Sequence, residues 1–409
     1  MVRRRLAPAY LSLAAAISCQ SIAGIDDKEL DPKYKTTTPK DASTDVVVAD
    51  SSWDAGPQLN GWSPVPPGRP AGTPTPSGKG ARRFFAARNV YFGSVDPTTK
   101  KVDADAWKAF GHAIDTEETT TKILQSKSSL VCDKRSSASA DLLVDGNEGR
   151  DNVGGHLLSY GSTTLNFSFE EDTNRDIESA KKPTYLLMLE DLDSGADDAY
   201  VPGAIFVTVK RDLAVEPLPV WNGSDVFYVD ANTVIAPDGG TADAGTADAG
   251  SPDAADGGDF SLVPRFRFPA GYVRNNVWVS GDFGNTPMTM PLYAFDPVNL
   301  VDVETMTLVV ELSQQHDTVV RSMMSAVISA QNMDVQFRPI ASKMVNCDVL
   351  QTGLLMGFLS STMDLYTSPP AFEQAGSECN AASMAFAFDW VPVVAPPGAK
   401  QVAPEPQCP

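Results

Sequence analysis

Two acid-rich loops carry the side chains best suited to binding a hard metal ion. The first holds Asp145, Asn147 and Asp151 within a glycine-punctuated run at 145–155 (DGNEGRDNVGG). The second places acids on both sides of Gly195, namely Asp191, Asp193, Asp197 and Asp198. Calcium takes six to eight oxygen ligands, and loops of this composition supply several, although neither has the twelve-residue EF-hand register. We therefore regard both loops as candidate calcium sites, with local turns capped by Asp and Asn side chains as the alternative.

The chain offers little that predicts catalysis. Asp302 and Glu304 alternate along a predicted strand, so they would share one face, as the paired carboxylates of a sandwich glycosidase do. The carboxylate expected before them is missing, because Asn299 and Leu300 stand there. The three histidines are isolated in sequence, and no nucleophile elbow of the Gly-x-Ser-x-Gly type accompanies them. No catalytic residue is assigned from the sequence.

Five cysteines are present, and the first differs in context from the others. Cys19 follows three N-terminal arginines and an apolar stretch at 6–17, which is the layout of a bacterial secretory signal. Small residues running into a cysteine indicate lipidation at Cys19, and ordinary cleavage after Ala23 is the alternative. The remaining cysteines are even in number, as expected for disulfides in an oxidising compartment, and sequence leaves their pairing open: Cys132, Cys347, Cys379 and Cys408.

Composition divides the chain into a signal peptide at 1–18, a disordered tether at 19–79 and one folded domain at 80–409. The tether is rich in Asp, Thr, Pro, Ser and Gly, which bury too little apolar surface to fold. A low-complexity segment at 237–259 carries six aspartates and no basic residue, and it is expected to interrupt the domain as a loop between two strands. The net charge of −20 argues against nucleic acid as a partner.

The apolar pattern of the domain is mainly that of strands. Met384, Phe386, Phe388 and Trp390 alternate with smaller or polar residues, which predicts a strand with one buried face. A shorter alternation at 165–169 predicts another, and further candidates lie at 84–92, 185–189, 205–209, 226–229 and 306–312. Asn275 and Asn276 favour a two-residue hairpin between two further short strands at 272–274 and 277–279. One helix is predicted after Cys347, over about 350–365. We expect an antiparallel β-sandwich, in which Trp390 packs in the core and Trp221 lies exposed in a loop.

Four segments resemble a family of uncharacterised exported lipoproteins of myxobacteria and their relatives. They are 19–27 (CQSIAGIDD), the run at 145–155, 221–230 (WNGSDVFYVD) and the closing 379–383 (CNAAS) with the terminal Cys408. The resemblance covers most of the predicted domain and implies export, but it carries no assigned chemistry.

The sequence thus predicts a lipid-anchored envelope protein that serves as a non-catalytic binding or structural module. Its candidate partners are the membrane, through the N-terminal lipid, and a glycan, an envelope polymer or another protein. The alternative is a carbohydrate or ester hydrolase built on the sandwich. Gln20 replaces the aspartate that favours inner-membrane retention, so the outer membrane is the expected location, with secretion as the alternative.

Overall fold

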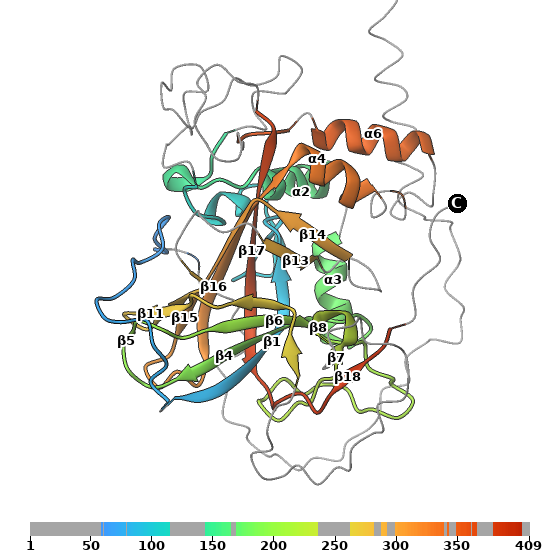
Figure 1. The fold of residues 1–409 in the computed structure, drawn as a ribbon. Helices are drawn as coiled ribbons and strands as arrows, with labels where there is room; N and C mark the ends of the chain where they lie inside the picture. Colours follow the sequence, from blue (N-terminus) through green and yellow to red (C-terminus); the bar gives the residue numbers. More distant parts are fainter. Residues whose placement is uncertain are drawn as a thin grey trace, which may run out of the picture.

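A computed structural model describes residues 59, 61–78, 80–114, 144–164, 169–235, 262–281, 288–292, 299–338, 342, 349–360, 362–365 and 379–402. Within these residues the fold is mainly β, and its centre is one antiparallel sheet of ten strands (Figure 1). The strands follow the order β10 (Phe266–Phe268), β6 (Gly203–Val207), β4 (Tyr185–Leu192), β1 (Ala81–Tyr91), β17 (Ala381–Pro392), β16 (Val319–Ser329), β15 (Thr305–Leu312), β12 (Val277–Val279), β11 (Tyr272–Arg274) and β5 (Asp197–Asp198).

The sheet curls until its two ends approach each other. Strands β10 and β11 lie eight positions apart in the sheet order, yet only residues 269–271 connect them. A link of three residues spans at most about 10–14 Å, so the ends must be neighbours in space. The predicted antiparallel, mainly β character is confirmed, but one curled sheet replaces the two stacked sheets of the predicted sandwich.

The two faces of the sheet are built from different residues. Along β17, Phe386, Phe388 and Trp390 point to the interior of the curl, while Ala385 and Ala387 lie on the outer face. The interior packs tightly, leaving a cavity of about 10 Å³ between aromatic and methionine side chains, which is room for a single water at most. Small residues on the outer face let covering segments approach closely, so both faces are buried.

Short elements surround the sheet. The helices are α2 (Val153–Thr164), α3 (Phe169–Glu178), α4 (Ala330–Asn332) and α6 (Val349–Ser360), with helical turns η3 (Ala106–Ala109), η5 (Asn147–Gly149), η6 (Ala231–Thr233) and η7 (Met333–Phe337). Four strand pairs complete the fold: β2 (Val95–Asp96) with β3 (Lys101–Val102), β7 (Val229–Asp230) with β18 (Ala399–Lys400), β8 (Val234–Ile235) with β9 (Val263–Pro264), and β13 (Met288–Leu292) with β14 (Asn299–Val303). Figure 1 shows α2, α4 and α6 at one end of the molecule, and β7 and β18 at the other.

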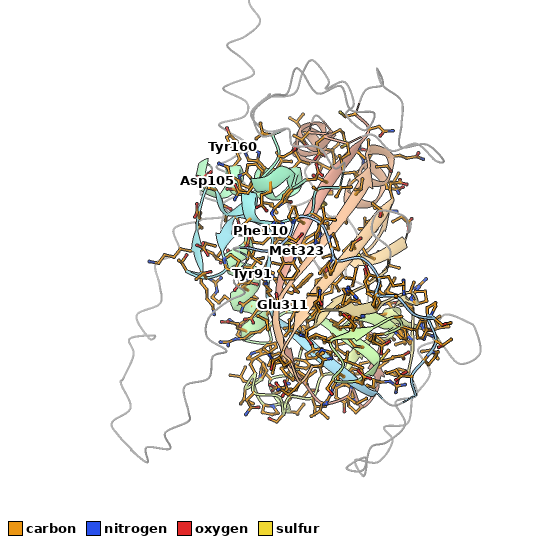
Figure 2. All side chains as sticks on the ribbon, turned by 90° about the vertical axis from the view of Figure 1, so that its left-hand side faces the viewer. Tyr91, Asp105, Phe110, Tyr160, Glu311 and Met323 are labelled. Carbon is orange, nitrogen blue, oxygen red and sulfur yellow. The ribbon has the colours of Figure 1, made fainter. Side chains whose placement is uncertain are left out.

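Residues 61–78, here called the strap, cross the outer face of the sheet in extended form. Trp62 is buried in a cluster that contains Tyr91, Phe110 and Met323, and Figure 2 shows these three side chains near the centre of this face. The Arg69 guanidinium donates to the carbonyl oxygens of Ala199 and Ala270. The folded body therefore begins about twenty residues earlier than the predicted tether boundary at 79.

Several local predictions are confirmed. Strands β1, β4, β6, β15 and β17 lie where alternation predicted them, and α6 lies within the predicted helical segment. Asn275 and Asn276 both adopt positive φ, 52° and 63°, and close the β11–β12 hairpin. The acidic segment 237–259 lies outside the described residues, but β8 and β9 on either side of it pair with each other.

Two local predictions are wrong. Phe169 begins α3 rather than ending a strand, because Glu170, Glu171 and Asp172 follow it in the first helical turn, where acidic side chains favour the helix N-terminus. Trp221 is buried rather than exposed, with its indole nitrogen donating to the carbonyl oxygen of Glu178.

Candidate functional site

The run at 145–155 docks onto the outer face of the sheet. The Arg150 side chain is only 4% exposed and donates to the carbonyl oxygens of Gly111, at 2.7 Å, and Trp62. The Asn152 side chain accepts from the amides of Gly155 and Ala385, joining α2 to β17. This run therefore organises the covering layer, and it holds the end of the strap through Trp62.

Two predicted calcium ligands of the first loop, Asp145 and Asp151, take part in the same packing. An Asp151 oxygen accepts from the Ile114 amide at 2.6 Å. Burial of Asp364 raises the pKa of its carboxyl, and the nearby buried Asp145 raises that pKa further. Asn147 is exposed, so the three predicted ligands do not share one surface. Calcium at this loop stays a prediction.

The acidic side chains of the second predicted calcium loop stabilise local turns and bind other segments of the chain. Asp191 accepts from the amides of Gly78 and Gly80; burial alone would raise its pKa, but these bonds hold it below the ordinary value. Asp193 accepts from the Gly195 amide, Asp197 pairs with Arg274 at 2.9 Å, and Asp198 accepts from the Tyr200 amide. Among the described residues no group of three or more His, Cys, Asp or Glu side chains could hold a metal ion.

Two pairs of side chains combine residue types used in hydrolysis. The His112 ring nitrogen Nδ1 lies 2.8 Å from Ser325 Oγ, and Ser383 Oγ donates to Asp364 at 2.5 Å. His112 is fully buried, and this burial together with the nearby Arg150 cation lowers its pKa to about 3 and keeps the imidazole neutral. Burial raises the pKa of Asp364 to about 6, although Ser383 opposes this with two hydrogen bonds. Both serines are also buried, so a substrate would reach neither pair without local opening.

Asp302 of the predicted carboxylate pair supports the fold instead. Its amide donates to the Gln336 side-chain oxygen at 2.6 Å, and its carboxylate accepts from the Gln336 nitrogen at 2.8 Å. Glu304 lies between β14 and β15, outside both strands. Asp302 therefore connects β14 to η7.

The buried side chain of Glu170 joins α3 to the sheet. Glu170 Oε2 accepts from both the amide and the hydroxyl of Ser94, at 2.8 and 2.6 Å, while Oε1 has no hydrogen-bond partner among the described residues. Burial raises the pKa of Glu170 to about 7, with the Ser94 bonds acting in the opposite direction. This carboxyl fixes α3 against the turn after β1.

The surface best suited to binding is a loop at 210–226, here called the aliphatic loop. Its ends meet where the Val209 amide donates to the Tyr228 carbonyl at 2.9 Å. Five large aliphatic side chains point to solvent, from 44% exposed at Val226 to 78% at Val215; the others are Leu213, Leu218 and Val220. A surface loop whose ends meet in this way is similar to an Ω-loop, a class that often carries function.

One ion pair of the aliphatic loop points inward, while Lys210 and Asp212 at the start of the loop are exposed. Arg211 and Asp225 form an ion pair at 3.5 Å with side chains only 8% and 4% exposed. Arg211 donates to the carbonyls of Pro217 and Val226, while Asp225 accepts from the amides of Val220 and Trp221. Polar groups therefore fix the backbone from inside, and the aliphatic side chains remain outside.

The body of the molecule holds the aliphatic loop in place. Trp221 packs on Phe227 with ring centroids 5.5 Å apart, and Lys400 of β18 donates to Glu216 at 2.7 Å. The Asp225 carbonyl accepts from the Val394 amide, and Val394 is itself an exposed aliphatic residue. The loop thus lies beside β7 and β18, at the end of the molecule opposite α6 (Figure 1).

Sequence reasoning missed the aliphatic loop, although it identified the 221–230 segment that anchors it. The stretch at 213–220 (LAVEPLPV) is apolar but has neither helical nor strand periodicity. Its two prolines cannot donate to a sheet, so a central strand is excluded there. An apolar run that cannot form a buried strand is the signal that would have indicated an exposed surface.

No helix in the described part of the chain is long and apolar enough to cross a bilayer. Of the cysteines, Cys379 is described and is fully buried before β17, while Cys19, Cys132, Cys347 and Cys408 lie outside the described residues. In comparisons with known proteins, no family model, no curated protein and no solved structure matches this chain.

Proposed function

We propose that this chain is a lipid-anchored protein of the cell envelope that works by binding, without catalysis, through the aliphatic loop. The observation that carries the proposal is that this loop buries the ion pair of Arg211 and Asp225 and exposes five large aliphatic side chains. Large exposed apolar patches on soluble proteins mark interaction sites. Contact of apolar surface with water is unfavourable, so its burial against a partner lowers the free energy. A backbone fixed in advance by Arg211 and Asp225 lowers the entropy cost of docking.

The anchoring half of the proposal rests on the N-terminal residues. Three arginines, an apolar stretch and small residues before Cys19 support export and acylation, with the outer membrane as the location. Disulfides among the later cysteines fit the same compartment. The resemblance to exported lipoproteins supports this reading.

Hydrolysis is the less supported alternative. The two candidate polar pairs, His112 with Ser325 and Asp364 with Ser383, lie in buried packing rather than at an open surface. Their hydrogen bonds connect the covering layer to β16 and β17, which is a sufficient reason for their presence.

Replacing Cys19 tests the anchor. In cells labelled with radioactive palmitate, the Cys19→Ala variant is expected to lose the label completely, because the thiol that receives the lipid is gone. Ser21→Ala is the matched control, since it changes a neighbouring small residue and keeps the cysteine. Full labelling of Cys19→Ala would show that the acyl group is elsewhere, and the anchor at Cys19 would then be refuted.

A further inference from the structure

We propose that the partner of the aliphatic loop is the apolar layer of a lipid bilayer, which extends the proposed function by naming what its binding surface contacts. The loop would act as a second membrane contact beside the N-terminal lipid. Binding of an apolar surface to a bilayer adds to the effect of a lipid anchor, and its strength increases with the apolar area that is buried.

The exposed residues of the loop fit acyl chains better than a protein surface. Protein interfaces concentrate their binding energy in Trp, Tyr and Arg. Here the tryptophan and the arginine, Trp221 and Arg211, are turned inward and buried against the body. The large apolar side chains that remain outside are all aliphatic, and such side chains gain free energy from apolar surroundings roughly in proportion to buried area.

The charge of the loop surface is low enough for insertion. Of the charged residues in the loop, Lys210 and Asp212 are exposed and carry opposite charges, while Arg211, Glu216 and Asp225 are partly or fully buried. Asp225 is paired with Arg211, and Glu216 accepts from Lys400. The chain as a whole carries a net charge of −20, so attraction to anionic headgroups is not the driving force.

The chain that precedes the described body is long enough to allow this contact. Thirty-nine residues separate Cys19 from Leu59, and this length of chain spans at most about 140 Å when extended. A domain of this size has a radius of gyration of about 20 Å. Every face of the body, including the end with the aliphatic loop, therefore lies within reach of the membrane that holds Cys19.

The experiment uses the full mature chain with Cys19→Ser, exported behind an ordinary secretory signal so that it carries no acyl group. Co-flotation with vesicles of phosphatidylcholine and phosphatidylethanolamine measures binding by the loop alone. We expect binding to these vesicles, and weaker binding when phosphatidylglycerol is added, because the acidic chain is repelled. The double variant Val215→Asp, Leu218→Asp is expected to reduce the partition coefficient at least tenfold.

The matched control replaces two exposed aliphatic residues at the other end of the molecule, Val349→Asp with Leu350→Asp, at the start of α6. This control is expected to bind as the parent does, and thermal melting of both double variants verifies folding. Three outcomes would overturn the proposal: no flotation of the parent, equal loss in both double variants, or a dimer that the loop variant disrupts while vesicle binding is absent. None of these depends on acylation, so the anchor proposal would stand or fall separately.

Discussion

Replacing Trp278 with alanine is expected to lower the free energy of unfolding by about 3–5 kcal/mol, the usual range for a fully buried tryptophan. Trp278 lies on β12 near one end of the sheet and has no exposed surface. Its indole nitrogen donates to the Val201 carbonyl at 2.8 Å, just before β6 at the other end. Trp278 therefore connects the two ends that the curl brings together.

The close fit around Trp278 explains the expected size of the effect. A Cβ atom on Gly203 would lie 2.7 Å from Trp278 Cζ2, and one on Gly271 would lie 2.9 Å from Nε1. Phe268 of β10 meets the same indole edge to face, with ring centroids 5.7 Å apart. The neighbouring groups are too tightly packed to move into the space of the indole, so truncation of Trp278 leaves a cavity.

Urea denaturation measures this loss. Trp278→Phe keeps most of the ring packing and removes one hydrogen bond, so we expect a smaller loss of about 1–2 kcal/mol. The matched control is Tyr160→Ala on α2, an aromatic residue that is 45% exposed, for which the change is expected to stay within about 0.5 kcal/mol. Equal stabilities for Trp278→Ala and Tyr160→Ala would contradict the closure of the sheet by this residue.

The second large effect is expected for Arg150→Met, which removes the cation and keeps a long apolar side chain. The carbonyls of Gly111 and Trp62 would lose their donor in a buried place. Each unsatisfied buried group costs about 1–3 kcal/mol, so for the two carbonyls a total loss of about 2–6 kcal/mol is expected. Because Trp62 belongs to the strap, proteolytic cleavage within 61–78 should also become faster.

Limited proteolysis with mapping of the cleavage sites, together with urea denaturation, checks this expectation. Arg175→Met on α3 is the matched control, because its ion pair with Asp172 lies at the surface, with Arg175 68% exposed. Surface pairs of this kind contribute little. If both variants were cleaved at the same rate and unfolded alike, Arg150 would not hold the strap to the sheet.

The sequence predicted those elements whose signal is local. Alternation located β17, and two consecutive asparagines located the β11–β12 hairpin because both must adopt positive φ. Alternation does not reveal which strands become neighbours, so it favoured a sandwich where the chain forms one curled sheet. At 165–169 the alternation was too short to outweigh the acidic first turn of α3.

The strap shows what composition alone cannot predict. Residues 61–78 have the proline and glycine content of a linker, and their order comes from partners far away in the chain. Arg69 contacts residues more than one hundred positions later, and Tyr272 donates to the Pro67 carbonyl. The aliphatic loop is a similar case, since the direction of its side chains follows from the buried pair of Arg211 and Asp225.

The central claim is that this protein acts at a membrane surface through the aliphatic loop, and crosslinking in living cells tests it most directly. A photoreactive amino acid placed at Val215, and at Val320 on β16 as the control, reports what each exposed site contacts. We expect phospholipid adducts at position 215, detected by mass spectrometry, and none at position 320. A discrete protein adduct at position 215, or equal lipid labelling at both positions, would contradict it.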